Sequence, residues 1–201
     1  MTRTGIFGGT FSPPHRGHIR AAAAFVSEMK LDRLLVIPAC IPPHKNIDDP
    51  GPDLRLEMTR AAFSDNAGFS IPVKVSDYEI RKSGVSYTVD TLEHFSDPDT
   101  ELFLLCGGDM FESLESWREP ERIFSLASVV GIMREDGTEQ EMRKYAERYR
   151  KKYGAKCYVL GERALEVSST LLRTMIKRGE NTEEYLSPEV RRIIEREKLY
   201  R

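Results

Sequence analysis

The sequence predicts an α/β protein built on a doubly wound, mostly parallel sheet with helices on both faces. Short apolar runs bounded by Gly or Pro recur at residues 4–8, 33–38, 102–106 and 128–133, as in strands that are buried on both faces. Segments with helical periodicity lie between these runs. Strands that alternate with helices form parallel sheets, which bind ligands at the carboxyl ends of their strands.

The first strand, helix and strand form a βαβ unit. A strand over residues 4–8 ends in two glycines, and two prolines keep the following segment extended. The alanine-rich segment after the prolines predicts a helix over about 16–30. The apolar run 33–38, which ends at a proline, predicts the second strand.

The remaining elements continue the alternation. Residues 39–52 are rich in Pro, Asp and Gly and predict a long irregular loop, a kind of connection that is often functional. We then expect, in chain order, a helix capped by Asp53 to about residue 63, an extended segment 69–75, a capped helix start within 86–92, strands 102–106 and 128–133, a solvated helix 138–153, a strand near 156–160, and helices 171–178 and 188–197.

Composition bounds the class of protein. The 201 residues, 40% of them hydrophobic, predict a single domain over 1–201, on which a small C-terminal helical segment, about 168–201, is packed. The 30 Lys and Arg against 32 Asp and Glu leave a charge of −2, so no basic field indicates a nucleic-acid partner. The sequence is compatible with a homo-oligomer.

Cysteine spacing and hydropathy predict the cellular location. Cys40, Cys106 and Cys157 lie far apart without Cys-x-x-Cys spacing, which favours neither disulfides nor a zinc site and fits a reducing cytoplasm. The N-terminus has no signal-peptide pattern, and no apolar stretch approaches the roughly 18 residues of a membrane span. We therefore expect a soluble, cytoplasmic protein with no membrane partner.

The segment after the first strand has the outline of a phosphate site. Gly8 and Gly9 lack side chains, so their backbone N–H groups can approach an anion closely. His15 and His18, with Gly17 between them, fall at or near a helix N-terminus, where unpaired N–H groups and the helix dipole favour phosphate. The segment is neither a Walker A loop nor the Gly-x-Gly-x-x-Gly dinucleotide fingerprint.

Two further segments indicate anion or nucleotide binding. They are Gly107, Gly108 and Asp109 after the strand 102–106, and Ser168, Ser169 and Thr170 before the helix 171–178. The Asp109 carboxylate is suited to accept hydrogen bonds from nucleotide ribose hydroxyls. The hydroxyls before the second helix, together with the guanidinium fork of Arg173, make that N-terminus a second phosphate or adenine cradle. Plain helix capping and an exposed helix arginine are the alternatives.

Taken together, these motifs resemble those of bacterial nicotinate mononucleotide adenylyltransferases, within the nucleotidyltransferase superfamily whose signature is (His/Thr)-x-Gly-His. The matching segments, in the family's order, are 8–18, 42–45, 86–92, 107–109 with Trp117, 167–170 with Arg173, and the C-terminal 185–188 and 199–200. Ser12 stands where the family usually has Asp, and Val167 where Ile is common. The resemblance covers nearly the whole chain and implies a Rossmann-like fold.

The resemblance implies a reaction that joins nicotinate mononucleotide to the AMP moiety of ATP and releases pyrophosphate, in NAD biosynthesis. The attacking phosphate oxygen is already anionic, so neither a general base nor a covalent intermediate is needed. His15 and His18 are suited to donate to the α- and β-phosphates, Arg173 to grip phosphate, and Mg²⁺ carried with ATP to screen pyrophosphate. His18 is the first choice for transition-state stabilisation. We expect no metal site on the protein itself.

The acceptor residues also follow from the resemblance. Trp117 is expected to stack on the pyridinium ring of nicotinate mononucleotide, which an indole face attracts. Tyr87 and Thr88 open a helix, where hydroxyl and backbone donors suit a carboxylate better than a carboxamide. The other assigned residues are Thr10 and Phe11, which would floor the acceptor site, Lys45, which would contact phosphate from its loop beside His44, and His94, which we interpret as structural.

Other functions share parts of this pattern. An adenylyl- or cytidylyltransferase for another acceptor, such as phosphopantetheine, uses the same His-x-Gly-His core, but the Tyr87 and Trp117 elements argue against it. Nicotinamide mononucleotide is an alternative acceptor. A catalytically silent nucleotide sensor is an alternative from another class. A fragment of a class I aminoacyl-tRNA synthetase is disfavoured, because the chain is short and has no basic face for tRNA.

Overall fold

The computed structural model describes residues 1–43, 50–64, 68–133, 138–163 and 167–201. Within these ranges a sheet of six strands has the order β3-β2-β1-β4-β5-β6, and every neighbouring pair is parallel. The strands are β1 (Thr2–Gly9), β2 (Arg33–Pro38), β3 (Val73–Val75), β4 (Thr100–Gly107), β5 (Ala127–Met133) and β6 (Cys157–Arg163). This order confirms a doubly wound fold, because the chain leaves β1 toward one edge and later returns to β4 on its other side.

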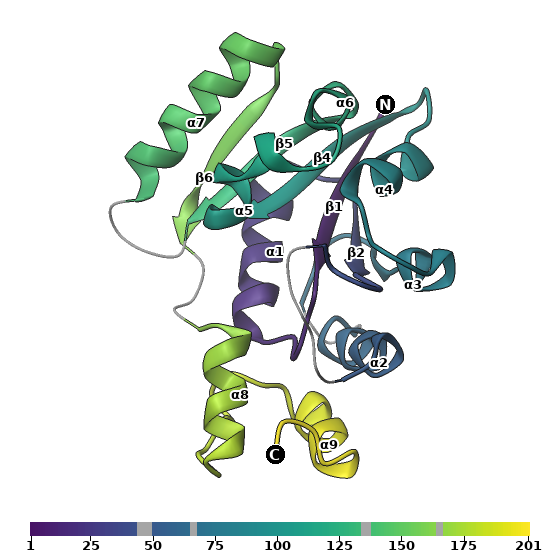
Figure 1. Cartoon of the computed structure of the whole chain (residues 1–201), viewed down its shortest axis with the longest axis vertical. Helices are drawn as coiled ribbons and strands as arrows, with labels where there is room; N and C mark the ends of the chain where they lie inside the picture. Colours follow the sequence, from purple (N-terminus) through teal and green to yellow (C-terminus); the bar gives the residue numbers. More distant parts are fainter. Residues whose placement is uncertain (44–49, 65–67, 134–137, 164–166) are drawn as a thin grey trace.

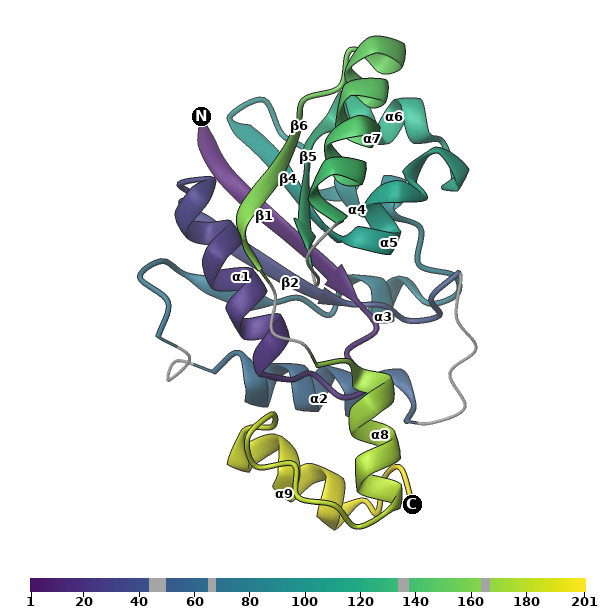
Figure 2. The same ribbon diagram turned by 90° about the vertical axis from the view of Figure 1, so that its left-hand side faces the viewer.

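The helices connect successive strands, and the last two follow the sheet. They are α1 (Arg16–Glu28), α2 (Pro52–Ala62), α3 (Tyr78–Lys82), α4 (Thr88–Phe95), α5 (Gly108–Glu112), the 3₁₀ turn η2 (Leu114–Ser116), α6 (Pro120–Leu126), α7 (Thr138–Tyr153), α8 (Ser169–Lys177) and α9 (Pro188–Arg196). Figure 2 shows α1 on one side of the sheet and α4, α5, α6 and α7 on the other.

The strands bury side chains on both faces, because successive residues point to opposite sides. In β4, Leu102, Leu104 and Cys106 face the core beneath α4, α5, α6 and α7. Phe103 and Leu105 face the core beneath α1. All five are at most 3% exposed, and burying one such apolar side chain is worth about 1.5–3 kcal/mol. The predicted core strand therefore stabilises both layers.

The C-terminal helices form a third cluster at one end of the sheet. Leu172 of α8 and Val190 of α9 pack with Met58 of α2, and each is 0% exposed. Figure 1 places α8 and α9 beyond the end of the sheet at which β1 finishes. The backbone N–H of Arg16 donates to the carbonyl of Tyr185 at 2.8 Å. This bond joins the C-terminal segment to the start of α1.

Most predicted elements are confirmed, and the differences have local causes. Asp53 does not cap α2: Gly51 is the N-cap and Pro52 occupies the first turn, a position that suits proline because its missing N–H would be unpaired there. The segment 69–75 pairs only over Val73–Val75. The helices α3, α5 and α6 were not predicted, because five to seven residues are too few to show a helical period. No helix within the described ranges combines the length and apolarity needed to cross a membrane.

Candidate functional site

The two glycine-ended strands lie side by side at the centre of the sheet. β1 and β4 are neighbours, β1 leads to α1 on one face, and β4 leads to α5 on the other. In a doubly wound sheet this switch point leaves a crevice at the carboxyl ends of the strands, where ligands bind. A Cβ added at Gly8 or at Gly107 would meet no atom within 4 Å. Both glycines therefore border open space at the switch point.

The other glycines of the segment have reasons within the fold. A Cβ at Gly9 would lie 2.9 Å from the ring of Phe11, and a Cβ at Gly17 would lie 2.9 Å from Nδ1 of His15. Both distances are shorter than those found for real Cβ atoms, so the rings of Phe11 and His15 can keep these positions only if residues 9 and 17 are glycine. Of these three glycines, only Gly8 has no neighbouring side chain that would clash with a Cβ.

His15 and His18 stand together at the N-terminus of α1. His15 is the N-cap residue, is 5% exposed, and its ring centroid lies 3.7 Å from that of His18. The backbone N–H of His15 donates to Nδ1 of His18 at 3.1 Å, so the neutral His18 ring carries its proton on Nε2. The Phe11 ring packs edge-on against His18, with centroids 5.1 Å apart. The protein thus fixes both the orientation of His18 and the nitrogen that donates.

The N-terminus of α8 contacts the same loop. Ser168 is the N-cap, and its Oγ accepts the N–H of Leu171 at 3.1 Å. The hydroxyl of Ser169 donates to the Pro13 carbonyl at 2.9 Å. Nη1 of Arg173 donates to the Ser12 carbonyl at 2.9 Å, and Nη2 donates to the hydroxyl of Thr170 at 3.1 Å. The loop between β1 and α1 is therefore held by the helix that the sequence predicts as the second cradle.

Ser12 and the chain terminus make a further link. The Ser12 hydroxyl and the Tyr200 hydroxyl lie 3.0 Å apart in a hydrogen bond, and Ser12 is 3% exposed. The serine that replaces the Asp expected from the family pattern is thus partnered by the penultimate residue of the chain. Tyr200 was not predicted as part of this region, because a C-terminal tyrosine has no local pattern that indicates a contact 188 residues away.

Tyr87 and Trp117 come from distant segments that meet. The guanidinium carbon of Arg118 lies over the Tyr87 ring at 4.7 Å from its centroid. Trp117 is partly buried against the core under α4 to α7, and its Nε1 donates to the hydroxyl of Ser113 at 3.3 Å. Thr88 is the first residue of α4, as predicted, and Tyr87 is its N-cap. Arg118, the neighbour of Trp117, was missed by sequence reasoning.

The remaining predicted residues differ in their surroundings. Phe11 is 1% exposed and supports Gly9 and His18, while Thr10 next to it accepts a bond from Arg55. Asp109 is exposed in the first turn of α5, directly after β4. The His94 ring stacks on Tyr78 with centroids 3.8 Å apart, in keeping with a structural role. Lys45 and His44 lie outside the described residues.

The thiols of Cys106 and Cys157 are buried in the core. Burial raises the pKa of the Cys106 thiol and raises that of Cys157 to about 11, so both stay protonated at neutral pH. In the part of the chain that the structure describes, no group of three or more His, Cys, Asp or Glu side chains is arranged to hold a metal ion.

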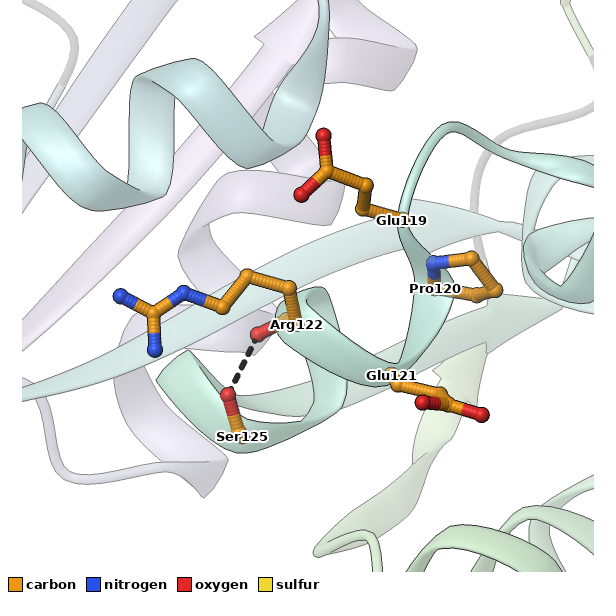
Figure 3. A pocket seen from close by; sticks show the side chains of 5 residues that line it. All are labelled: Glu119, Pro120, Glu121, Arg122 and Ser125. Atoms are coloured by element: carbon orange, nitrogen blue, oxygen red, sulfur yellow. Dashed lines mark hydrogen bonds between the residues drawn. The ribbon is translucent and has the colours of Figure 1, made fainter.

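A separate hollow lies at the start of α6 (Figure 3). It has a volume of about 470 Å³ and is lined by Glu119, Pro120, Glu121, Arg122 and Ser125. The Arg122 guanidinium is already bound to Glu93 at 2.8 Å, and the Ser125 hydroxyl donates to the Arg122 carbonyl at 2.8 Å. Its lining includes none of the predicted site residues, so this hollow is distinct from the crevice.

Comparison with known proteins gives the family. Residues 6–193 match the cytidylyltransferase-like family. A probable nicotinate-nucleotide adenylyltransferase of Clostridium botulinum is 38% identical over 202 residues, covering 100% of this chain and 99% of the relative. One from Desulfitobacterium hafniense is 36% identical over 204 residues, covering 99% and 96%. The chain belongs to the nicotinate-nucleotide adenylyltransferase family.

Solved structures agree on the fold. A Plasmodium falciparum nicotinic acid mononucleotide adenylyltransferase, complexed with NaAD, is similar with a TM-score of 0.79 at 18% identity, over 100% of this chain and 98% of that one. The Rossmann-like fold described above is therefore shared with that protein. In this chain the predicted signature His-x-Gly-His lies where the loop after β1 enters α1.

Proposed function

We propose that the crevice at the ends of β1 and β4 transfers the AMP moiety of ATP to nicotinate mononucleotide, giving nicotinate adenine dinucleotide and pyrophosphate. The observation that carries the proposal is the convergence of two helix N-termini, those of α1 and α8, on the loop that follows β1. The first turns of both helices contain no Asp or Glu. Such termini favour anions, and both substrates are polyanions.

The reaction is a direct displacement. An oxygen of the acceptor phosphate forms a bond to the α-phosphorus of ATP, and the bond from that phosphorus to the oxygen bridging to the β-phosphate breaks. Pyrophosphate leaves with the bonding electrons. The nucleophile is already ionised, so the protein has to position two polyanions and stabilise the charge that grows on the leaving group.

The donors for this charge come from the two helices. The bond at Nδ1 leaves the Nε2–H of His18 as the ring's donor, and we assign this donor, with His15 beside it, to the leaving phosphates. Arg173 has five N–H groups, so it can keep its bonds to Ser12 and Thr170 and also bind phosphate. Gly8 leaves room for a phosphate beside the backbone, while Gly9 and Gly17, also assigned to ATP binding, leave room for the rings of Phe11 and His15. Ser168 and Ser169 complete the second cradle. Mg²⁺ enters with ATP as part of that substrate.

The acceptor occupies the opposite side of the crevice. Trp117 supplies an indole face for the pyridinium ring, and Tyr87 and Thr88 supply donors for its carboxylate. Asp109, at the end of β4, accepts from ribose hydroxyls. Thr10 is assigned to the floor of the acceptor site, and Phe11, which is 1% exposed, supports that floor through its contacts at Gly9 and His18. Lys45 is assigned to bind phosphate.

The test is pyrophosphate release from Mg²⁺ and ATP with nicotinate mononucleotide, nicotinamide mononucleotide or phosphopantetheine offered in parallel. Release with nicotinate mononucleotide alone is expected. A preference for the amide acceptor would keep the mechanism and overturn the roles of Tyr87 and Thr88. Release with none of the three would indicate a nucleotide sensor instead.

A further inference from the structure

Two buried charged residues lie behind the loops that carry the acceptor residues. Arg55 of α2 is 1% exposed, and Glu79 of α3 is 8% exposed. We propose that Arg55 and Glu79 are positioning residues that fix the ends of β1 and β2 and the segment before α4 in the geometry that receives the acceptor nucleotide. This inference rests on the proposed function, because it concerns the acceptor side of the same reaction.

The Arg55 guanidinium joins three backbone carbonyls from two loops, one in the loop after β1 and one near each end of the loop between β2 and α2. Its Nη1 donates to Thr10 at 3.0 Å, its Nη2 to Cys40 at 2.7 Å and its Nε to Pro50 at 3.3 Å. Thr10 follows β1, Cys40 lies in the loop after β2, and Pro50 precedes α2. A guanidinium presents its donors in a rigid planar fork, so these three carbonyls are held in one fixed relation.

Glu79 holds the segment before α4 from the other side. The Thr91 hydroxyl donates to its carboxylate at 2.6 Å, and Ser86 is a second hydrogen-bonding side chain. Burial raises the pKa of Glu79, and the hydrogen bonds from Thr91 and Ser86 oppose that shift. The carboxylate thereby fixes Ser86, the residue before Tyr87.

The two charged groups are connected through Cys40 and Ser86. The backbone N–H of Cys40 donates to the Ser86 hydroxyl at 2.8 Å, while the Cys40 carbonyl accepts from Arg55. The backbone adds a parallel bridge between Ile41 and Val85. A continuous chain of hydrogen bonds thus runs from Thr10 through Arg55, Cys40 and Ser86 to Glu79. Both α2 and α3 pack against β2, which anchors the chain in the sheet (Figure 1).

Stability alone is a weak explanation for this arrangement. Desolvation lowers the pKa of Arg55, so its burial carries a free-energy cost that the carbonyls and nearby groups, Glu79 among them, offset. Buried charged groups are often replaced by apolar side chains of similar volume without loss of stability. Their connection to three site loops therefore favours positioning as their role.

The experiment compares Arg55→Lys and Glu79→Gln with the unchanged protein. Lysine keeps the charge but cannot donate to all three carbonyls in the planar arrangement of a guanidinium. Glutamine replaces one of the two acceptor oxygens of Glu79 by an NH₂ donor. We expect Arg55→Lys to raise the KM for the acceptor about tenfold, with the KM for ATP within about twofold. Amide hydrogen exchange in the ligand-free protein should increase in the segments 39–43 and 85–88. The double variant should change the acceptor KM by less than the product of the single effects, because both act in one network.

Two control variants separate positioning from general destabilisation. Arg60→Lys makes the same chemical change on α2 at a side chain that is 55% exposed, and should leave both KM values unchanged. Met58→Ala removes a side chain that is 0% exposed on the same helix, and should lower the melting temperature without separating the two KM values.

Equal rises in both KM values for Arg55→Lys, or unchanged exchange in the two segments, would overturn the positioning role. If the unchanged protein releases no pyrophosphate with any acceptor, the proposed function fails. The exchange measurement then still decides whether Arg55 and Glu79 order these loops.

Discussion

Gly8→Ala should have opposite effects on stability and on catalysis. Gly8 lies in β1 with extended backbone, and a Cβ there would meet no atom within 4 Å. Alanine in such a position stabilises a protein by about 0.4–1 kcal/mol, because it reduces the conformational freedom of the unfolded chain. At about 2–4 °C per kcal/mol for a chain of this size, the melting temperature should rise by about 1–4 °C.

The same methyl group should damage catalysis. It would enter the space where we place the phosphates of ATP. At least one hydrogen bond from a backbone N–H to a phosphate would then be lost. Such a bond is worth about 1.5–3 kcal/mol, so kcat/KM for ATP should fall about 10- to 100-fold. Steady-state pyrophosphate release and a thermal melt measure the two effects on one preparation.

Two other glycines serve as controls for Gly8→Ala. Gly161→Ala in β6 would bring its Cβ 3.9 Å from the Glu28 carboxylate, an ordinary contact, and should leave the kinetics unchanged. Gly9→Ala would press on the Phe11 ring and should lower the melting temperature, since overpacking costs about 1–3 kcal/mol. A Gly8→Ala protein with kcat/KM for ATP within about twofold of the original would refute the placement of phosphate beside β1.

Four further outcomes are expected. His18→Ala should lower kcat by about 10²- to 10³-fold in the pyrophosphate assay, with an unchanged circular dichroism spectrum. Trp117→Ala should raise the acceptor KM about tenfold and leave the KM for ATP nearly unchanged; if neither constant moves, the indole only packs. Tyr149→Phe removes a buried hydroxyl that donates to two backbone carbonyls, and should cost about 1–3 kcal/mol in urea unfolding. Burial raises the pKa of Glu79, so the folded protein binds a proton at this carboxyl group more readily than the unfolded chain does. The stability that this proton binding contributes is fully present below the ordinary pKa of 4.5 and is lost as pH rises through the folded pKa. The melting temperature of the original protein minus that of Glu79→Gln should therefore increase as pH falls. A difference that does not change with pH would contradict this.

Features encoded by neighbouring residues were predictable from the sequence. The apolar runs of β1, β2, β4 and β5 identify strands because each is short, continuous and bounded by turn residues. The pairing of His15 with His18 at a helix start was predictable because residues three positions apart lie on the same side of a helix. That Gly8 and Gly107 border the same crevice follows from the strand order, which local sequence does not specify.

Features created by tertiary packing were missed. Arg55 and Glu79 are charged residues in short helices, and such residues normally face solvent. Their burial arises only when α2 and α3 pack against β2 in the folded chain. Arg118 likewise contacts Tyr87 across a sequence separation that no periodicity reveals. A charge in a helix indicates a positioning role only after its partners are known.

The most direct test of adenylyl transfer by this crevice follows the α-phosphate of ATP. The protein is incubated with Mg²⁺, α-³²P-labelled ATP and nicotinate mononucleotide, and the products are separated by chromatography. We predict that the label appears in a dinucleotide that contains nicotinate, in an amount equal to the pyrophosphate released, and that His18→Ala forms it far more slowly. Label that stays in ATP or appears only as AMP would contradict adenylyl transfer by this site.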